Sequence, residues 1–366
     1  MSIASPPAER QLIEQYLEAL RALPDVHPDP PRWESMLSET DQQCDAQINI
    51  VLAGKPFILV IEAKRSVYPR DVHQVLGQLR RFTRDNVSAS TSNDRVSIIV
   101  ADAISPGAKD LLRRERVGYY DRGGSLFLPA SGAYVYIDKP PPKTLAKSMR
   151  SLFSGRRAQV LHALLVRTRD WFNGKEVADQ AHVSQATASE VLTELERFDW
   201  VVSRGQGPGK ERHLKDPAAL LDAWAKQVES ARAPTLRRFY VPSLKKDQLL
   251  EPIGRVFGDH KIEYEISYEA AAQCYAPFLS AISQIRCRLI SGSAFDAALS
   301  DLDARVVTEG ANFAVIEANS PGELLFREHF AGVWLASPIQ VYLDLLRGEG
   351  RAKEMAAHLR KQRIGF

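Results

Sequence analysis

Cysteine is scarce in this chain, with only Cys44, Cys274 and Cys287 among 366 residues. An odd number without metal-ligand spacing argues against a disulfide framework and against a structural zinc site. The histidines are scattered and show no ligand spacing either. We therefore expect a protein of a reducing cytoplasm, without structural zinc.

Long apolar runs and a strong net charge are also lacking. No apolar stretch approaches the ~20 residues of a membrane-spanning helix, and the first residues lack the basic start and apolar run of a signal peptide. We therefore expect no membrane association. The formal net charge is only +3, so any affinity for nucleic acid must come from local basic surfaces. At 366 residues the chain has room for two or three domains.

The middle of the chain, from Arg156 to Asp216, has a pattern typical of a helix-turn-helix. A short helix carries apolar residues on one face, His182 and Val183 make a tight turn, and Ser184 is a good N-cap for a second helix that runs to about Phe198. The apolar residues expected in the core are Val177, Ala178, Ala181, Ala188, Val191, Leu192, Leu195 and Phe198.

The outward face of the second predicted helix begins with short polar side chains. Such side chains can approach base edges in a major groove, and a helix N-terminus attracts phosphate. An apolar strand, a tip from Gly205 to Gly209 and a returning strand follow, which predicts a β-hairpin wing with basic residues beside its tip. The candidate DNA-binding residues are Ser184, Gln185, Thr187, Ser189, Arg204, Lys210 and Arg212.

This segment resembles the winged helix-turn-helix of bacterial transcriptional regulators of the multiple-antibiotic-resistance repressor type. The resemblance implies binding to double-stranded DNA. Because paired winged helices match palindromic half-sites, it also predicts a homodimer. The alternative is a helix pair and hairpin that only pack, as in a protein–protein module.

The N-terminal segment predicts a helix over 9–22 and then two strands, 44–52 and 56–61, ending in Glu62-Ala63-Lys64. Asp45 stands near the start of the first strand. Residues i and i+2 of a strand point the same way, so the sheet can place two carboxylates and an ammonium on one face. Two carboxylates can hold Mg²⁺, and a lysine can stabilise phosphorane-like charge or orient the attacking water.

This arrangement resembles the PD-(D/E)XK nuclease superfamily, which includes Holliday-junction resolvases and restriction endonucleases. A glutamine pair, one turn apart on the following predicted helix, matches a pair found in part of that superfamily. A strand over 96–100, a helix to about Arg116 and a strand over 117–120 would complete the core. The resemblance implies catalytic roles for Asp45, Glu62, Lys64, Gln74 and Gln78, with Mg²⁺ held by Asp45 and Glu62.

Cys44 stands where that superfamily has proline, a departure that weakens the motif. A Glu-x-Lys triplet is also common, and its alternative interpretation is a solvated strand end. We therefore expect the nuclease-like fold and leave metal-dependent cleavage open.

From about Ser243 the chain predicts alternating helices and strands. The basic, aromatic stretch 232–242 before it could touch DNA or be a linker, and we interpret it as a linker. Gly292-Ser293, followed by Asp301 and Asp303, has the spacing of a nucleotidyltransferase signature, with Glu317 as a third carboxylate. The favoured alternative is an amphipathic helix over 294–302.

Three segments carry a resemblance over essentially the whole chain: SPGAKDLLRRERVGYYD at 105–121, YEAAAQCYAPFL at 268–279 and SPIQVYLDLL at 337–346. They resemble the transcriptional-regulator antitoxins of AbiE-like type IV toxin-antitoxin systems. Membership would imply repression of the protein's own operon and neutralisation of a nucleotidyltransferase-like toxin partner.

The expected fold is α/β multidomain: a PD-(D/E)XK restriction-endonuclease-like domain over 1–140, a winged helix-turn-helix over 150–230 and an α/β domain over 243–366, for which a nucleotidyltransferase-like fold is one option. The leading function is a cytoplasmic, double-stranded-DNA-binding regulator of antitoxin type. The alternatives are a Mg²⁺-dependent DNA endonuclease or junction resolvase targeted by the winged helix, and an antitoxin that binds only protein.

Overall fold

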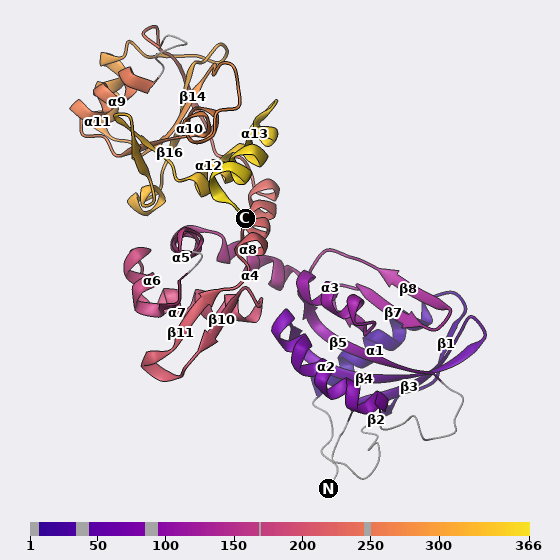
Figure 1. Ribbon diagram of the computed structural model, residues 1–366. Helices are drawn as coiled ribbons and strands as arrows, with labels where there is room; N and C mark the ends of the chain where they lie inside the picture. Colours follow the sequence, from indigo (N-terminus) through magenta and orange to yellow (C-terminus); the bar gives the residue numbers. More distant parts are fainter. Residues whose placement is uncertain (1–6, 34–43, 85–93, 168–169, 245–249) are drawn as a thin grey trace. The chain divides into compact units, whose positions relative to one another are not determined.

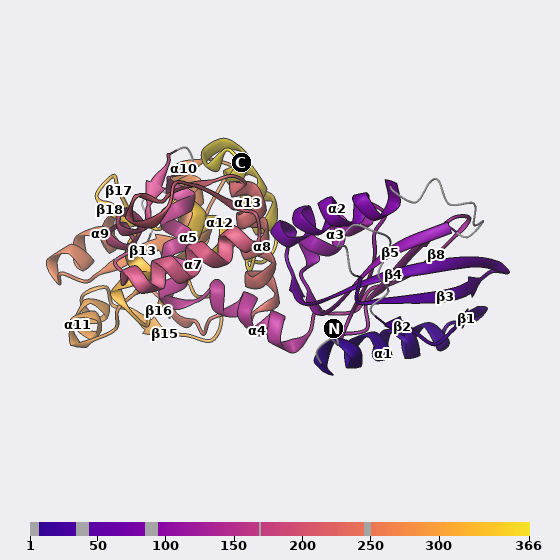
Figure 2. The same cartoon turned by 90° about the horizontal axis from the view of Figure 1, so that it is seen from below.

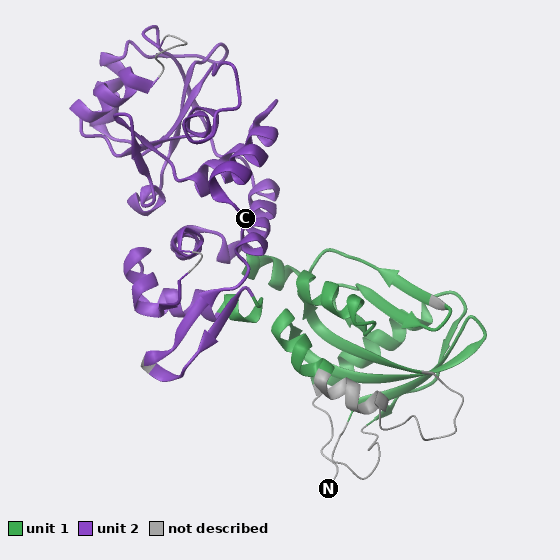
Figure 3. Ribbon diagram, in the orientation of Figure 1, with its two compact units in different colours: residues 1–149, 194–199 green, residues 150–193, 200–366 purple. Residues whose placement is uncertain are grey.

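A computed structural model describes residues 7–33, 44–84, 94–167, 170–244 and 250–366 (Figure 1). The chain divides into two compact units, residues 1–149 with 194–199 and residues 150–193 with 200–366 (Figure 3). Both units combine helices with sheets. The prediction of a mixed α/β multidomain protein is therefore confirmed.

The first unit is organised around an eight-stranded sheet with the order β1-β3-β4-β5-β6-β7-β8, and β2 pairs with β3. β3 and β4 form an antiparallel hairpin, whereas β4, β5 and β6 run parallel. The strands are β1 (Val26–Pro28), β2 (Arg32–Trp33), β3 (Ala46–Leu52), β4 (Lys55–Val67), β5 (Asp94–Ile104), β6 (Gly118–Asp121), β7 (Leu126–Ala130) and β8 (Ala133–Ile137).

Helices cover both faces of this sheet: α1 (Pro7–Arg21) lies on one face, and α2 (Pro69–Arg84) and α3 (Pro106–Arg114) lie on the other (Figure 2). A further helix, α4 (Lys143–Leu152), follows the sheet. The parallel strands are linked by α2 and α3, which is the usual connection because parallel neighbours need a long crossover. Ser105 caps α3 by accepting a hydrogen bond from the Ala108 N–H at 3.3 Å.

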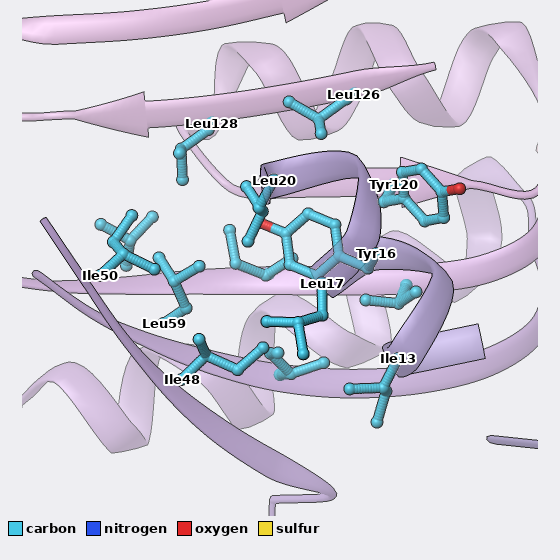
Figure 4. Packing of buried hydrophobic residues seen from close by; sticks show 14 of the residues in the cluster. Ile13, Tyr16, Leu17, Leu20, Ile48, Ile50, Leu59, Tyr120, Leu126 and Leu128 are labelled. Carbon is cyan, nitrogen blue, oxygen red and sulfur yellow. The ribbon is translucent and has the colours of Figure 1, made fainter. Parts of the chain in front are cut away.

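α1 is held against the sheet by the apolar side chains on one of its faces, which recur at the spacing that the sequence predicts. Its buried side chains lie against apolar residues of β3, β4 and β6 (Figure 4). Complete burial of such side chains contributes roughly 1.5–3 kcal/mol each. The prediction of a helix over 9–22 is confirmed, and its apolar residues are Leu12, Ile13, Tyr16, Leu17 and Leu20.

β4 is longer than the sequence predicts. The apolar run ends at Ile61, but the strand continues to Val67 because β5 pairs with it as far as Ile104. Glu62 and Lys64 therefore lie inside a central strand and not at its end, which corrects the prediction. Pairing with a neighbouring strand, which local hydropathy does not reveal, extended the strand.

The second unit begins with a helical segment that carries a small sheet of order β10-β11-β9. α6 and α7 follow each other directly, and β10 and β11 form the hairpin after them. The elements are α5 (Gly155–Val166), β9 (Phe172–Asn173), α6 (Gly174–Gln180), α7 (Gln185–Arg197), β10 (Val201–Arg204), β11 (Glu211–Leu214) and α8 (Pro217–Ser230). The last residues of α7, from 194 on, are grouped with the first unit.

The remainder of the second unit is a seven-stranded mixed sheet with the order β15-β12-β16-β14-β13-β18-β17. Its strands are β12 (Arg237–Tyr240), β13 (Tyr264–Ser267), β14 (Ile285–Leu289), β15 (Arg305–Val306), β16 (Phe313–Glu317), β17 (Glu328–Phe330) and β18 (Val333–Leu335). Its helices are α9 (Leu250–Asp259), α10 (Tyr268–Tyr275), α11 (Ser293–Asp301), α12 (Pro338–Leu345) and α13 (Ala352–Leu359).

The stretch 232–242 is not only a linker, contrary to the prediction, because its residues 237–240 form a strand. It supplies β12, which lies between β15 and β16, and its Phe239 is buried. A short strand with one inward aromatic residue is ambiguous in sequence, because its partners lie more than 60 positions away.

Candidate functional site

The hairpin of β3 and β4 brings Asp45 and Glu62 together, as the sequence predicts from their positions. The Asp45 N–H donates to the Ile61 carbonyl oxygen at 3.0 Å. The Asp45 Oδ2 accepts from the Ala63 N–H at 2.7 Å. Both contacts fix Asp45 to the backbone on either side of Glu62.

Lys64 lies beside Glu62, and its Nζ donates to Glu62 Oε1 at 2.7 Å. Burial raises the pKa of Glu62, while Lys64 lowers it and Asp45 raises it. Burial alone would lower the pKa of Lys64, but Glu62 and Asp45 more than offset this and raise it. The three side chains therefore form one electrostatic cluster in which the lysine stays charged.

Glu9, in the first turn of α1, belongs to the same cluster, and sequence reasoning missed it. Partial burial raises the pKa of Glu9, Asp45 and Glu62 raise it further, and Lys64 lowers it. These interactions place the Glu9 carboxylate within electrostatic reach of all three residues. The only sequence signal was an acidic residue in a helix first turn, which is common for reasons unrelated to a site.

The residues present have the chemistry of a Mg²⁺ site, because carboxylate oxygens are ligands that this ion prefers and it keeps several waters. In the described ranges no three His, Cys, Asp or Glu side chains lie close enough to hold a metal ion together. A metal between Asp45 and Glu62 would therefore take most of its ligands from water or from a bound phosphate.

The predicted glutamine pair lies on α2. Gln74 is exposed to solvent. Gln78 lies in the last turns of α2, where the side chains are outside the described residues. The roles of both glutamines stay predictions.

The second unit has the predicted helix, tight turn and second helix. The Val183 N–H bonds to the Ala178 carbonyl oxygen at 3.0 Å, and His182 has a left-handed φ of 51°, so the chain reverses just after α6. Ser184 Oγ accepts from the Thr187 N–H at 3.1 Å, which confirms Ser184 as the N-cap of α7. The apolar residues predicted for the core are buried: Val177, Ala178, Ala181, Ala188, Val191, Leu192, Leu195 and Phe198.

The start of α7 presents polar side chains outward. Ser184, Gln185 and Ser189 are exposed, and Thr187 is half-buried. The hydroxyl of Ser184 also lies 2.9 Å from that of Thr187, so these two residues are held in place by each other. The first turn of α7 therefore offers hydroxyl and amide groups together with the backbone N–H groups of a helix start, of which that of Thr187 is capped by Ser184.

Beside the hairpin tip, Arg204 has a defined position. Its guanidinium lies 4.1 Å from the centre of the Trp171 ring, and its Nε donates to Glu211 Oε2 at 2.7 Å. Trp171 in turn packs against the ring of His213 at 5.4 Å. Trp171 was missed because it precedes β9, a strand of two residues that the sequence does not predict.

The other two predicted wing cations are placed differently. Lys210 is half-buried, and Arg212 is buried, at 9% exposure, on the face of β11 opposite His213. Alternation along a strand puts neighbouring residues on opposite faces, so Arg212 faces the interior of the unit. A substitution of Arg212 would therefore perturb packing as well as any contact with DNA.

The nucleotidyltransferase signature does not form one carboxylate cluster. Asp301 ends α11 and pairs with His260 at 2.6 Å, Asp303 pairs with Arg305 at 2.9 Å, and Glu317 pairs with Arg237 at 3.1 Å. The amphipathic helix predicted over 294–302 is confirmed as α11, whose apolar side is buried. A nucleotidyltransferase-like fold for this region stays a prediction.

The chain matches no protein-family model and no curated protein in sequence comparisons. Within the described ranges, no helix is both long enough and apolar enough to cross a membrane.

Proposed function

We propose that this protein binds double-stranded DNA through α7 and the β10–β11 hairpin and acts as a transcriptional regulator of antitoxin type. The observation that carries the proposal is the juxtaposition of an exposed, polar first turn of α7 with a hairpin that holds Arg204 in place. Polar side chains at a helix start suit base edges and phosphates in a major groove. A cation beside the hairpin tip suits the neighbouring phosphate backbone.

Two partners belong to this proposal. Operators with two-fold symmetry are bound by symmetric dimers, so the DNA-bound form is a homodimer. The resemblance to AbiE-like antitoxins adds a toxin protein as the second partner. The toxin partner does not bear on the DNA contacts, which are tested separately.

We expect the double variant Arg204→Ala/Lys210→Ala to weaken duplex binding and to reduce its dependence on salt. Each lost phosphate contact lowers the slope of log K against log salt by about 0.9. The slope is measured by titrating a DNA duplex at several salt concentrations. Arg212 is left intact because its side chain is buried.

Arg305→Ala is the matched control for the wing variant. Arg305 is an exposed arginine on β15 that pairs with Asp303 at 2.9 Å, much as Arg204 pairs with Glu211. The control should leave the slope unchanged. Equal slopes for the wild type and the wing variant would refute DNA contact through the hairpin.

A second candidate function is metal-dependent DNA cleavage, as in an endonuclease or a Holliday-junction resolvase. It is favoured by the gathering of Asp45, Glu62 and Lys64, with Glu9 in electrostatic reach. Two carboxylates with waters can hold Mg²⁺, and a charged lysine stabilises the charge that develops on a phosphate under attack. The helix-turn-helix segment would then target the cleaving unit to DNA.

A further inference from the structure

A cavity of about 460 Å³ lies in the first unit where β4 and β5 end and α4 begins. Arg65, the residue after Lys64 on β4, lines this cavity. Three cations line it, Arg65, Arg122 and Lys143, against one carboxylate, Asp102. Other lining residues supply hydroxyl groups, such as Thr144 and Ser148, or apolar surface, such as Pro142 and Leu145.

The cations of this cavity are not all neutralised. Arg122 Nη2 pairs with Asp102 Oδ1 at 2.9 Å. Arg65 and Lys143 are exposed, and no carboxylate of the described residues pairs with either of them. The residues that line the cavity therefore carry an excess of two positive charges, which favours an anion.

We propose that this cavity binds the phosphomonoester group of a nucleotide. A phosphomonoester carries about −1.5 to −2 charges at pH 7, which matches the excess better than the single charge of a phosphodiester. Guanidinium groups bind phosphate oxygens in a planar, two-pronged geometry, and hydroxyl groups such as that of Thr144 add further donors.

The size of the cavity also indicates a nucleotide and not phosphate alone. At about 460 Å³ it lies within the range of small-molecule sites, roughly 300–1,000 Å³. Tyr68, Leu145 and Pro142 give it an apolar wall that can contact a sugar or a base. This inference goes beyond the proposed function, because it needs neither DNA contacts by the hairpin nor cleavage.

The phosphomonoester can come from a free nucleotide or from the 5′ end of a DNA strand. Binding of the full chain would be measured for thymidine 5′-monophosphate against thymidine, and for a 5′-phosphorylated oligonucleotide against its 5′-hydroxyl form. Preference for the phosphorylated form in the first pair identifies a free nucleotide as a ligand, and preference only in the second identifies a strand end. No preference in either pair overturns the proposal.

The double variant Arg65→Ala/Lys143→Ala should lose the preference, with binding of the phosphorylated ligand weakened about tenfold or more, because hydrogen bonds to charged groups are the strong ones. Arg114→Ala is the matched control, an exposed arginine of α3 outside the cavity. The hairpin variant Arg204→Ala/Lys210→Ala should retain the preference even where duplex binding fails. Loss of the preference in Arg114→Ala or in Arg204→Ala/Lys210→Ala would place the site elsewhere and overturn the proposal.

Discussion

Metal-dependent cleavage of DNA is expected to fall about 10²–10³-fold when Lys64 is replaced by alanine, because a preorganised charge aimed at the reacting phosphate has effects of this size. Lys64 is held by Glu62 at 2.7 Å, and the surrounding carboxylates raise its pKa, so it stays charged at neutral pH. Rates would be measured with Mg²⁺ and Mn²⁺ on linear, supercoiled and four-way-junction DNA.

Lys55→Ala is the control for this experiment, because Lys55 is an exposed lysine at the start of the same strand. Cleavage that survives in Lys64→Ala as well as in Lys55→Ala would show that a contaminant or another site cuts the DNA. Absence of any metal-dependent cleavage by the wild type would exclude the nuclease function for these substrates. Metal binding without cleavage would then be tested by thermal unfolding.

Metal binding can be measured by thermal unfolding, independently of cleavage. A metal that binds only the folded state raises its stability, by about 2.7 kcal/mol at one hundred times the dissociation constant. Mg²⁺ or Mn²⁺ should therefore raise the melting temperature of the wild type, and Asp45→Asn/Glu62→Gln should abolish the rise. The same variant should bind duplex DNA normally, since α7 and the hairpin are distant in sequence and unchanged. No rise in the wild type at millimolar Mg²⁺ would leave Glu62 and Lys64 as an ordinary ion pair.

The second large effect is expected at a buried charge cluster in the seven-stranded sheet. Arg288 donates to Glu265 Oε1 at 2.8 Å and to Asp344 Oδ1 at 3.0 Å. Asp344 also accepts from Ser267 at 2.5 Å and from Gln340 at 2.9 Å. Glu265 and Asp344 are both about 2% exposed, and the Arg288 guanidinium is the cation that pairs directly with both carboxylates.

Arg288→Met is therefore expected to destabilise the protein by about 3–5 kcal/mol, the usual cost of leaving a buried charge without its partner. The free energy of unfolding would be measured by urea titration. Arg305→Ala, which breaks an exposed ion pair, should cost less than about 1 kcal/mol. A similar small loss for both variants would contradict this prediction and would mean that water reaches the cluster.

The cluster also predicts how stability changes with pH. The pKa of Glu265 is raised to about 7, because the effect of burial, together with that of Asp344, exceeds the lowering by Arg288. Burial disfavours the charge of Arg288 too, but the two carboxylates more than offset this and raise its pKa. Both pKa values are raised, but a raised pKa disfavours the charge of Glu265 and favours the charge of Arg288. Both follow from two carboxylates around one guanidinium, because a proton on Glu265 makes the cluster neutral.

A carboxyl whose pKa is higher in the folded state than in the unfolded state favours folding at low pH. This contribution of Glu265 is fully present below pH 4.5, the ordinary pKa, and is lost as the pH rises through about 7. Its full size is about 3 kcal/mol, from 1.36 kcal/mol per pKa unit. Glu265→Gln should remove this part of the pH dependence, and an unchanged pH profile in that variant would contradict the assignment.

Features that depend on residues close together in the chain could be predicted directly from the sequence. The apolar spacing of α1, the N-cap Ser184 and the tight turn at His182 each depend on residues within a few positions of one another. A helix face or a capping hydrogen bond needs no distant partner. These features were therefore predicted with correct type and nearly correct bounds.

What only the tertiary structure decided depends on partners far apart in the chain. Pairing with β5 extended β4 past Glu62 and Lys64, and pairing with β15 and β16 made a strand of 237–240. Packing of α1 brought Glu9 to Asp45, and the alternation along β11 buried Arg212. Strand pairing and helix docking are set by the sum of many weak contacts, and no single segment carries that sum in its own sequence.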